Sequence, residues 1–305
     1  MVKSDSPLVS VAIVSCNHRD YLIECIESVR AQNYENVELV IGDDASEDGS
    51  QSYLETLSGD RRFVRVATIL HGARVGITRN TNAVLSCCSG KYIAWMGGDD
   101  VMLPGKIRKQ VEVLEAEPEI ELCFHDLILF ESCSGKYLGN MNGPDTPRRG
   151  TWVQLVQLGT INGACSTMTR NPGGRVKFNE RYPVASDWRF WIDLLRSSGG
   201  QFVYLDEVLG KYRRHGGNVS SAGGPHYRQA MLDHFLTIGD LWVDGGAPSH
   251  ALTSRLGNLA FSLRKVSGHK LQYAQCLGIA LALGPRWKAA IGLFAFLASG
   301  CQIRL

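Results

Sequence analysis

Between residues 9 and 116 the sequence alternates short apolar runs with segments of helical periodicity, and this alternation constrains the fold more than any other feature. Val9–Ser15 is rich in β-branched and apolar residues, as expected of a strand buried on both faces. From Tyr21 to Val29, apolar residues recur at helical spacing. The same two patterns then repeat along the chain. They predict an α/β fold, in which helices cover a parallel sheet.

Two of the predicted strands end in acidic residues. Further strands are expected at 37–42, at 64–70 and from Lys91, with helices to about Leu57, over 78–88 and from Pro104. Proline suits a first helical turn because its missing N–H has no partner there. Asp43-Asp44 follows one strand, and Gly97-Gly98-Asp99-Asp100 follows another. Because open α/β sheets bind ligands at the carboxyl ends of their strands, we expect a site there.

The second half has a different pattern. A hairpin is predicted from 120–130 and 136–138. Strands are also expected at 161–169, 202–205 and 208–212, and helices at 152–158 and from Trp188. From about Pro225 the pattern is helical only.

Composition and missing motifs exclude several classes of protein. The 305 residues are 44% hydrophobic and 20% charged, as in globular proteins, and the net charge of +2 predicts no nucleic-acid partner. Neither GxGxxG after the first strand nor GxxxxGK[ST] occurs. No apolar run suits a signal peptide or reaches the roughly 18–20 residues of a membrane span. We therefore expect a cytoplasmic protein, or one at the inner face of the membrane.

The acidic strand ends suit a metal-bound phosphate ligand. Asp99 and Asp100 are candidate Mg²⁺ or Mn²⁺ ligands that also hold a diphosphate, with glycines that let the ligand approach. The alternative is a helix cap and a solvated turn residue. Asp44 is an acceptor for a base N–H or a ribose hydroxyl, or else part of an Asx turn. Arg79 faces the same nucleotide, or is an ordinary surface arginine.

Two later segments carry further candidates. Ser186-Asp187 precedes an apolar helix, so one of them caps that helix, or Asp187 is a general base beside a cleft. Arg213-Arg214-His215 is either a basic turn or a clamp on a leaving diphosphate, with His215 as a further metal ligand.

The order of these motifs resembles the family-2 inverting glycosyltransferases of GT-A fold. The motifs are Val-Ala-Ile-Val-Ser-Cys-Asn, Gly-Asp-Asp-Ala-Ser-Glu-Asp-Gly-Ser, Gly-Ile-Thr-Arg-Asn and Gly-Gly-Asp-Asp-Val-Met-Leu-Pro-Gly-Lys, then Ser-Asp-Trp-Arg-Phe-Trp and Tyr-Arg-Arg-His-Gly-Gly-Asn-Val-Ser. The resemblance covers roughly residues 8–221. It implies a GT-A catalytic domain at 1–224, followed by a C-terminal helical region at 225–305. It also implies a nucleotide-sugar donor, a Mn²⁺ or Mg²⁺ cofactor, and inversion at the anomeric carbon.

The resemblance assigns roles by position. Asp187 corresponds to the catalytic base, Asp99 and His215 to metal ligands, and Arg213 and Arg214 to diphosphate contacts. The nucleotide-binding positions are Ser15, Asn17, Asp44, Arg79, Gly98 and Asp99. Two positions depart from the family pattern. Gly97 occupies the first acidic position of the DxD motif, and Ser186 replaces the commoner acid before the base.

The implied reaction moves a sugar, with a UDP-sugar favoured by the Asp44 and Arg79 pair, to a hydroxyl of a saccharide or lipid-linked acceptor. Surface polysaccharide or glycoconjugate assembly is the expected setting. One alternative is a nucleotide-sugar-binding or scaffold protein with impaired catalysis, which Gly97 permits. A nucleotidyltransferase is another, although the basic glycine-rich loop of that class is missing. The C-terminal helices pack on the catalytic domain or on a second subunit, or place Arg286-Trp287-Lys288 at a membrane surface.

Overall fold

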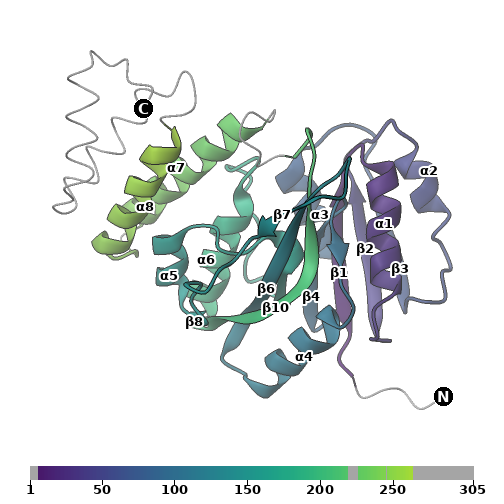
Figure 1. The fold of residues 1–305 in the computed structure, drawn as a ribbon, viewed down its shortest axis with the longest axis horizontal. Helices are drawn as coiled ribbons and strands as arrows, with labels where there is room; N and C mark the ends of the chain where they lie inside the picture. The colour runs from purple at the N-terminus through teal and green to yellow at the C-terminus, as the bar shows by residue number, and fades with distance from the viewer. Residues whose placement is uncertain (1–5, 219–225, 245, 264–305) are drawn as a thin grey trace.

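In the computed structural model, which describes residues 6–218, 226–244 and 246–263, ten strands form one sheet (Figure 1). The strands are β1 (Val9–Ser15), β2 (Val37–Asp43), β3 (Arg65–Leu70), β4 (Tyr92–Gly97), β5 (Val101–Met102), β6 (Ile120–Glu131), β7 (Tyr137–Asn140), β8 (Arg149–Gly150), β9 (Thr167–Arg170) and β10 (Gln201–Arg214). The helices are α1 (Arg19–Arg30), α2 (Ser50–Glu55), α3 (Ile77–Cys87), α4 (Lys106–Ala116), α5 (Trp152–Leu158), α6 (Ser186–Ser198), α7 (Tyr227–Val243) and α8 (Ser249–Leu263).

The sheet has a parallel half and a mixed half. Its order is β3-β2-β1-β4-β9-β6-β10-β5, with β7 paired to β6 and β8 to β10. The strands β3, β2, β1 and β4 are parallel, whereas β9 runs antiparallel to both of its neighbours, β4 and β6. The predicted α/β class is therefore confirmed, and the predicted hairpin is the antiparallel pair of β6 and β7.

Helices cover both faces because alternate residues of each buried strand point to opposite sides. Val11 and Ile13 of β1 pack in one hydrophobic cluster with residues of α1, α2 and α4. Ala12 packs in a second cluster, with residues of α3, α5 and α6. This two-sided burial explains why β1 reads as a continuous apolar run.

Four predicted boundaries are wrong. The helix expected from Pro104 begins at Lys106, because Gly105 precedes it with a left-handed φ of 87°. Ala185, rather than Ser186 or Asp187, is the N-cap of α6. The strand expected at 161–169 is a 3-10 turn at Ala164–Ser166 followed by β9. The strands expected at 202–205 and 208–212 are one strand, β10, because a bulge between Leu205 and Val208 preserves its pairing with β6.

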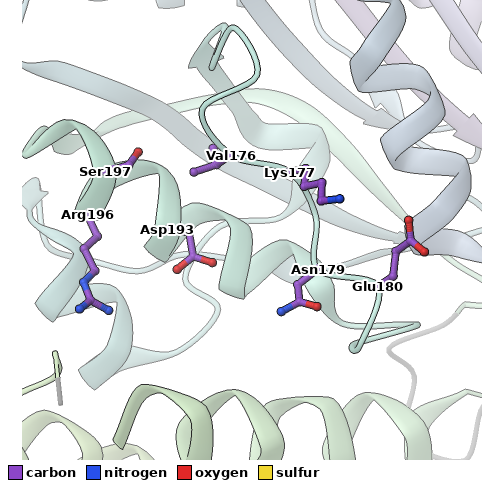
Figure 2. A pocket seen from close by; sticks show the side chains of 7 residues that line it. All are labelled: Val176, Lys177, Asn179, Glu180, Asp193, Arg196 and Ser197. Carbon is purple, nitrogen blue, oxygen red and sulfur yellow. The ribbon is translucent and has the colours of Figure 1, made fainter. Parts of the chain in front are cut away.

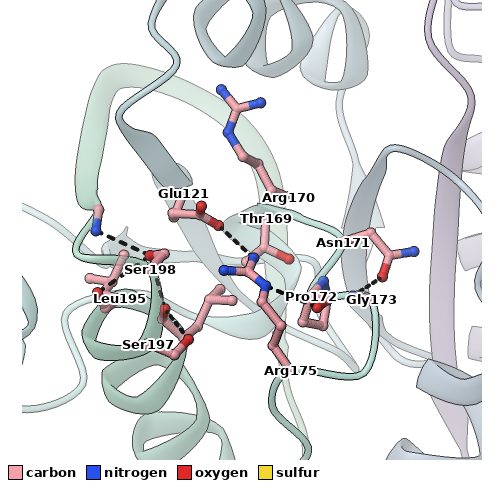
Figure 3. A network of polar contacts seen from close by, with 12 residues as sticks. Glu121, Thr169, Arg170, Asn171, Pro172, Gly173, Arg175, Leu195, Ser197 and Ser198 are labelled. Carbon is pink, nitrogen blue, oxygen red and sulfur yellow. Dashed lines mark hydrogen bonds and ion pairs between the residues drawn. The ribbon is translucent and has the colours of Figure 1, made fainter.

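The segment after β9 is folded back on itself before it leads to α6. Asn171 Oδ1 accepts the N–H of Gly173 at 3.0 Å, and Arg175 Nε donates to the carbonyl of Pro172 at 3.1 Å (Figure 3). Arg175 also lies 3.5 Å from Glu121 of β6. These contacts fix the start of the connection that carries the chain from the sheet to Asp187.

At the amino-terminal edge of the parallel strands, a buried carboxylate joins several segments. Glu38 of β2 accepts hydrogen bonds from Ser10 Oγ at 2.5 Å and from the N–H groups of Ser89 and Gly90 at 2.6 and 3.1 Å. Arg65 of β3 donates to the same carboxylate at 2.9 Å. One side chain thus ties β1, β2, β3 and the turn before β4 together.

The helices α7 and α8 pack on the α5–α6 side of the sheet (Figure 1). Ile238 and Leu241 of α7, with Leu252 and Leu256 of α8, belong to the same buried cluster as Trp188 of α6. The helical pattern predicted after Pro225 is thus confirmed for α7 and α8, whereas the rest of the predicted region, with Arg286, Trp287 and Lys288, lies outside the described residues. Among the helices described, none is both long and apolar enough to cross a bilayer.

Candidate active site

The carboxyl ends of β1, β2 and β4 meet at one edge of the sheet, as the sequence predicts. In the strand register Ser15 is the partner of Asp43, and Val14 is the partner of Gly97. Beyond the strands, the N–H of Asp44 donates to the carbonyl of Ser15 at 3.0 Å. The acidic residues that follow β2 and β4 therefore flank the end of β1.

The glycine pair lets the end of β4 pack closely on β1 and on its own acidic turn. A Cβ on Gly98 would lie 2.9 Å from Ser15 Oγ, and Ser15 Oγ is buried without a hydrogen-bond partner among the described residues. A Cβ on Gly97 would lie 2.7 Å from Asp99 Oδ1. In this conformation, Asp99 fills the space that a side chain at position 97 would need, which gives a steric reason for glycine there.

Asp44 fixes the start of α3. Its two carboxylate oxygens accept the N–H groups of Val75 and Gly76 at 2.6 and 3.0 Å. The local turn contact comes instead from Asp43, whose Oδ1 accepts the N–H of Ser46, three residues further on, at 2.8 Å. Each carboxylate oxygen of Asp44 has a second lone pair for a ligand N–H or hydroxyl.

Arg79 and Asn17 follow the strand ends in α3 and in the loop after β1. Arg79, in the first turn of α3, is 66% exposed at its side chain and pairs with Glu180 at 3.1 Å. Asn17 has a left-handed φ of 54°, and its Oδ1 accepts the N–H of Glu47 at 2.8 Å. Asn17 thus links the loops that follow β1 and β2.

Asp99 contacts the loop after β10. Its Oδ2 lies 2.9 Å from His215 Nε2 and accepts a hydrogen bond from Asn218 Nδ2 at 3.3 Å. His215 Nδ1 accepts the N–H of Gly217 at 3.2 Å, so Nε2 carries the proton in the neutral ring. Ligation of a cation by Nε2 would require the other tautomer.

Arg213, which precedes this loop, contacts the backbone of Asp99. Arg213 is 5% exposed, and its Nε donates to the carbonyl of Asp99 at 2.8 Å. Its guanidinium lies 4.5 Å from the ring centroid of Tyr21 and 4.7 Å from that of Phe130, and it pairs with Glu24. Arg214, which follows it, lies over the ring of Tyr212 at 5.8 Å.

Asp100 points into the protein rather than towards the edge. It is 3% exposed, and its Oδ1 accepts the N–H of Arg213 at 3.0 Å. Burial and the neighbouring carboxylate of Asp99 raise the pKa of Asp100 well above its ordinary value. Of the two aspartates, Asp99 is therefore the one placed to meet a cation.

Two aromatic side chains were not among the predicted site residues. His18 packs against the ring of His215 with centroids 5.0 Å apart, and Tyr21 does so at 5.2 Å. Burial lowers the pKa of His18, while the charge of Asp99 opposes this shift. Their position just after the first strand, at the predicted ligand edge, was the available signal.

Asp187 lies in the first turn of α6, beside the start of α3. Ser186 Oγ is 2.9 Å from Thr78 Oγ1, and Thr78 Oγ1 donates to the carbonyl of Tyr182 at 2.6 Å. The carboxylate of Asp187 accepts the N–H of Trp188 at 2.8 Å. Burial raises the pKa of Asp187 above its ordinary value. Through Thr78 and Asp44, the same end of α3 connects Asp187 to the strand-end residues.

The described residues fit a cation that is held mainly by its phosphate ligand. No group of three or more His, Cys, Asp or Glu side chains converges in the described part of the chain. One carboxylate, Asp99, with His215 beside it, leaves most of the coordination shell to phosphate oxygens and water, as is usual for Mg²⁺.

A separate cavity of about 810 Å³ opens between α6 and the segment that precedes it (Figure 2). Its lining comprises Val176, Lys177, Asn179, Glu180, Asp193, Arg196 and Ser197. None of the predicted site residues lines it. Glu180, which lines this cavity, pairs with Arg79 and so connects the cavity to the candidate site.

Comparison with known proteins gives one family. Residues 10–161 match the model of glycosyl transferase family 2. An uncharacterized glycosyltransferase of Haemophilus influenzae is 31% identical over 223 residues, which are 70% of this chain and 68% of that protein. The Escherichia coli UDP-Glc:alpha-D-GlcNAc-diphosphoundecaprenol beta-1,3-glucosyltransferase is 26% identical, over 70% of this chain and 80% of its own.

A similar fold occurs in solved structures. The structure of S. aureus TarS 1-349 in complex with UDP-GlcNAc has a TM-score of 0.68 and 16% identity, and the match covers 97% of this chain and 93% of that one. At this identity the likeness establishes the fold alone.

Proposed function

Because the chain belongs to glycosyl transferase family 2 and is therefore a glycosyltransferase, we propose that it transfers a sugar from a UDP-sugar to an acceptor hydroxyl with inversion. The observation that carries the proposal is the gathering of Ser15, Asp44, Gly98 and Asp99 at one sheet edge, with Asp99 bonded to His215. A UDP-sugar is supported by the relatives that act on UDP-Glc and bind UDP-GlcNAc.

We assign the nucleoside to the ends of β1, β2 and α3. The remaining lone pairs of Asp44 accept a base N–H or a ribose hydroxyl, and Ser15 and Asn17 lie beside it. Arg79 exchanges its pair with Glu180 for the nucleotide. We place Gly98 beside the nucleotide as well, because its missing side chain lets the end of β4 pack against Ser15 at this edge.

The diphosphate lies over Asp99 in this proposal. Asp99 supplies the carboxylate for a Mn²⁺ or Mg²⁺ ion, and His215 is a further ligand after a change of tautomer. Such a cation, when bound, offsets the negative charge that develops on the leaving diphosphate. Arg214 contacts the phosphates. Arg213 donates to the backbone carbonyl of Asp99, and its positive charge lies close to the diphosphate.

The chemical step is a single in-line displacement. The carboxylate of Asp187 takes the proton of the acceptor hydroxyl while that oxygen forms a bond to the anomeric carbon. The bond from this carbon to the phosphate oxygen breaks, and the nucleoside diphosphate leaves with the electron pair. A raised pKa makes Asp187 a stronger base than an exposed aspartate.

The acceptor is a saccharide or a lipid-linked saccharide, as the name of the Escherichia coli relative indicates for that protein. Surface polysaccharide assembly and a location at the inner membrane face follow from such an acceptor. The catalytic domain at 1–224 and the helical region at 225–305 remain our proposed division.

The test measures UDP release from UDP-glucose, UDP-galactose and UDP-GlcNAc with Mn²⁺ or Mg²⁺, with an α-D-GlcNAc-diphospholipid as acceptor. We expect metal-dependent turnover that Asp187→Asn lowers about 10²–10⁴-fold, while calorimetry shows unchanged affinity for UDP. Metal-dependent UDP binding without turnover would instead support the binding or scaffold alternative.

A further inference from the structure

A carboxylate on the C-terminal helix α7 holds the chain at the entrance of α6. Asp233 is fully buried, with 0% exposure. Its Oδ2 accepts the N–H groups of Val184 and Ala185, both at 2.8 Å. Its Oδ1 accepts the side-chain amide of Gln229, one turn earlier on α7, also at 2.8 Å. Three N–H dipoles therefore compensate a charge that would be costly to bury alone.

The two backbone donors belong to the residues that set where α6 begins. Ala185 is the N-cap of α6 and has no side-chain oxygen with which to cap it. Helix entries need acceptors for their N–H groups, and a local Ser, Thr, Asp or Asn usually supplies one. Here the carboxylate that anchors the entry comes instead from a helix 40 residues or more further along the chain.

Asp187 follows Ala185 by two residues, so this anchor fixes the stretch of backbone that leads into Asp187. Another tie at this point is the contact between Ser186 Oγ and Thr78 Oγ1 at 2.9 Å. The start of α6 is thus held from one direction by α3, which carries the nucleotide side, and from another by α7. Removal of either tie would let the first turn of α6 shift.

We propose that Asp233 is a positioning residue, which places the Asp187 carboxylate at reaction distance from the acceptor hydroxyl. This inference rests on the proposed role of Asp187 as the base. It makes α7 part of the machinery for catalysis. A base must lie within about 3 Å of the proton it removes, and a displacement of about 1 Å costs on the order of 10²-fold in rate.

The test compares Asp233→Ala, Asp233→Asn and Asp233→Glu in the full chain. The assay contains Mn²⁺, an α-D-GlcNAc-diphospholipid as acceptor, and UDP-glucose, UDP-galactose or UDP-GlcNAc as donor, whichever gives turnover with the parent. Asp233→Ala should lower kcat about 10²-fold and leave the donor KM and the Kd of UDP within about twofold. Asp233→Asn retains one acceptor oxygen, so its kcat should be at least about tenfold higher than that of Asp233→Ala.

Asp244→Asn is the matched control, because Asp244 follows the end of α7, is 45% exposed at its side chain, and contacts the side chain of Arg189 in α6 at 3.3 Å rather than the backbone before the helix. It should keep the parental kcat. If Asp233→Ala does not fold, Asp233→Glu decides, since it keeps the charge but its extra methylene pushes residues 184 and 185 away. It should lose about tenfold or more in kcat at unchanged donor affinity.

The inference and the proposed function fail in different ways. Turnover that survives in Asp187→Asn overturns the role of the base and, with it, this inference. If Asp187→Asn is inactive but Asp233→Ala and Asp233→Glu keep the parental kcat, Asp233 has no positioning role. A parallel loss of kcat and donor affinity in the Asp233 variants, with no recovery in Asp233→Asn, would mark it as purely structural.

Discussion

Gly98→Ala inserts one methyl group where the end of β4 meets the end of β1. The N–H of Gly98 donates to the carbonyl of Val14 at 2.9 Å. The new Cβ would lie 2.9 Å from both Cβ and Oγ of Ser15, and 3.2 Å from the backbone oxygen of Val14. Carbon atoms in contact normally lie about 3.5–4.0 Å apart, so the two strand ends must separate by roughly 0.6–1.1 Å.

This displacement should reduce both stability and rate. Overpacking of a buried site typically costs about 1–3 kcal/mol, and weakening of the Gly98 hydrogen bond adds up to about 1 kcal/mol. We therefore expect the free energy of unfolding to fall by about 1–4 kcal/mol. Because Asp99 follows directly, a shift of nearly 1 Å should also lower kcat by on the order of 10²-fold.

Urea unfolding gives the stability, and UDP release from the donor gives kcat. Gly72→Ala is the matched control, because Gly72 follows β3 at the same edge of the sheet and a Cβ there meets nothing within 4 Å. It should leave both quantities unchanged. A Gly98→Ala protein with parental stability and parental kcat would refute the close packing of β4 on β1 as the reason for this glycine.

Three further changes test the site. Because burial raises the pKa of Asp187 above its unfolded value of 3.8, the charged carboxylate destabilises the folded state at a pH above 3.8. At pH 7 Asp187→Asn should therefore unfold at an equal or higher urea concentration than the parent, and this difference should shrink as the pH falls towards 3.8. A variant that is less stable than the parent at pH 7 would contradict this. Asp99→Ala should weaken Mn²⁺-dependent UDP binding in calorimetry about tenfold or more, with a smaller loss for His215→Ala, whereas equal affinity with and without the metal in the parent would refute the cation site. Arg213→Lys should lower the free energy of unfolding by about 1–3 kcal/mol, since an ammonium group cannot reproduce the donation to Asp99 together with contact to two rings, and an unchanged urea midpoint would refute that role.

The parallel half of the fold was predictable because its strands are buried on both faces and its helices have one apolar face. The resulting periodicities differ clearly, so β1, β2 and β4 appear within one residue of their expected bounds. The mixed half was harder. The position of β9 between β4 and β6 depends on long-range pairing, which no local pattern encodes.

The strand-end residues of the site were predictable for the same reason, since topology alone brings Ser15, Asp44 and Asp99 to one edge. Side-chain contacts between distant segments were not. The sequence indicates that Arg213 is basic, but not that Tyr21 and Glu24 of α1 enclose it. Likewise, nothing local to Asp233 marks it as the acceptor for the backbone before α6.

The carboxylate of Glu38 has a consequence for engineering this protein. It joins β1, β2 and β3 at the edge of the sheet opposite the candidate site, through residues that lie outside the loops proposed to bind the substrate. The loops at the carboxyl ends of these strands can therefore be exchanged with those of other family members while the strands keep their register. Such chimaeras would allow sugar preference to be altered piece by piece on an unchanged scaffold.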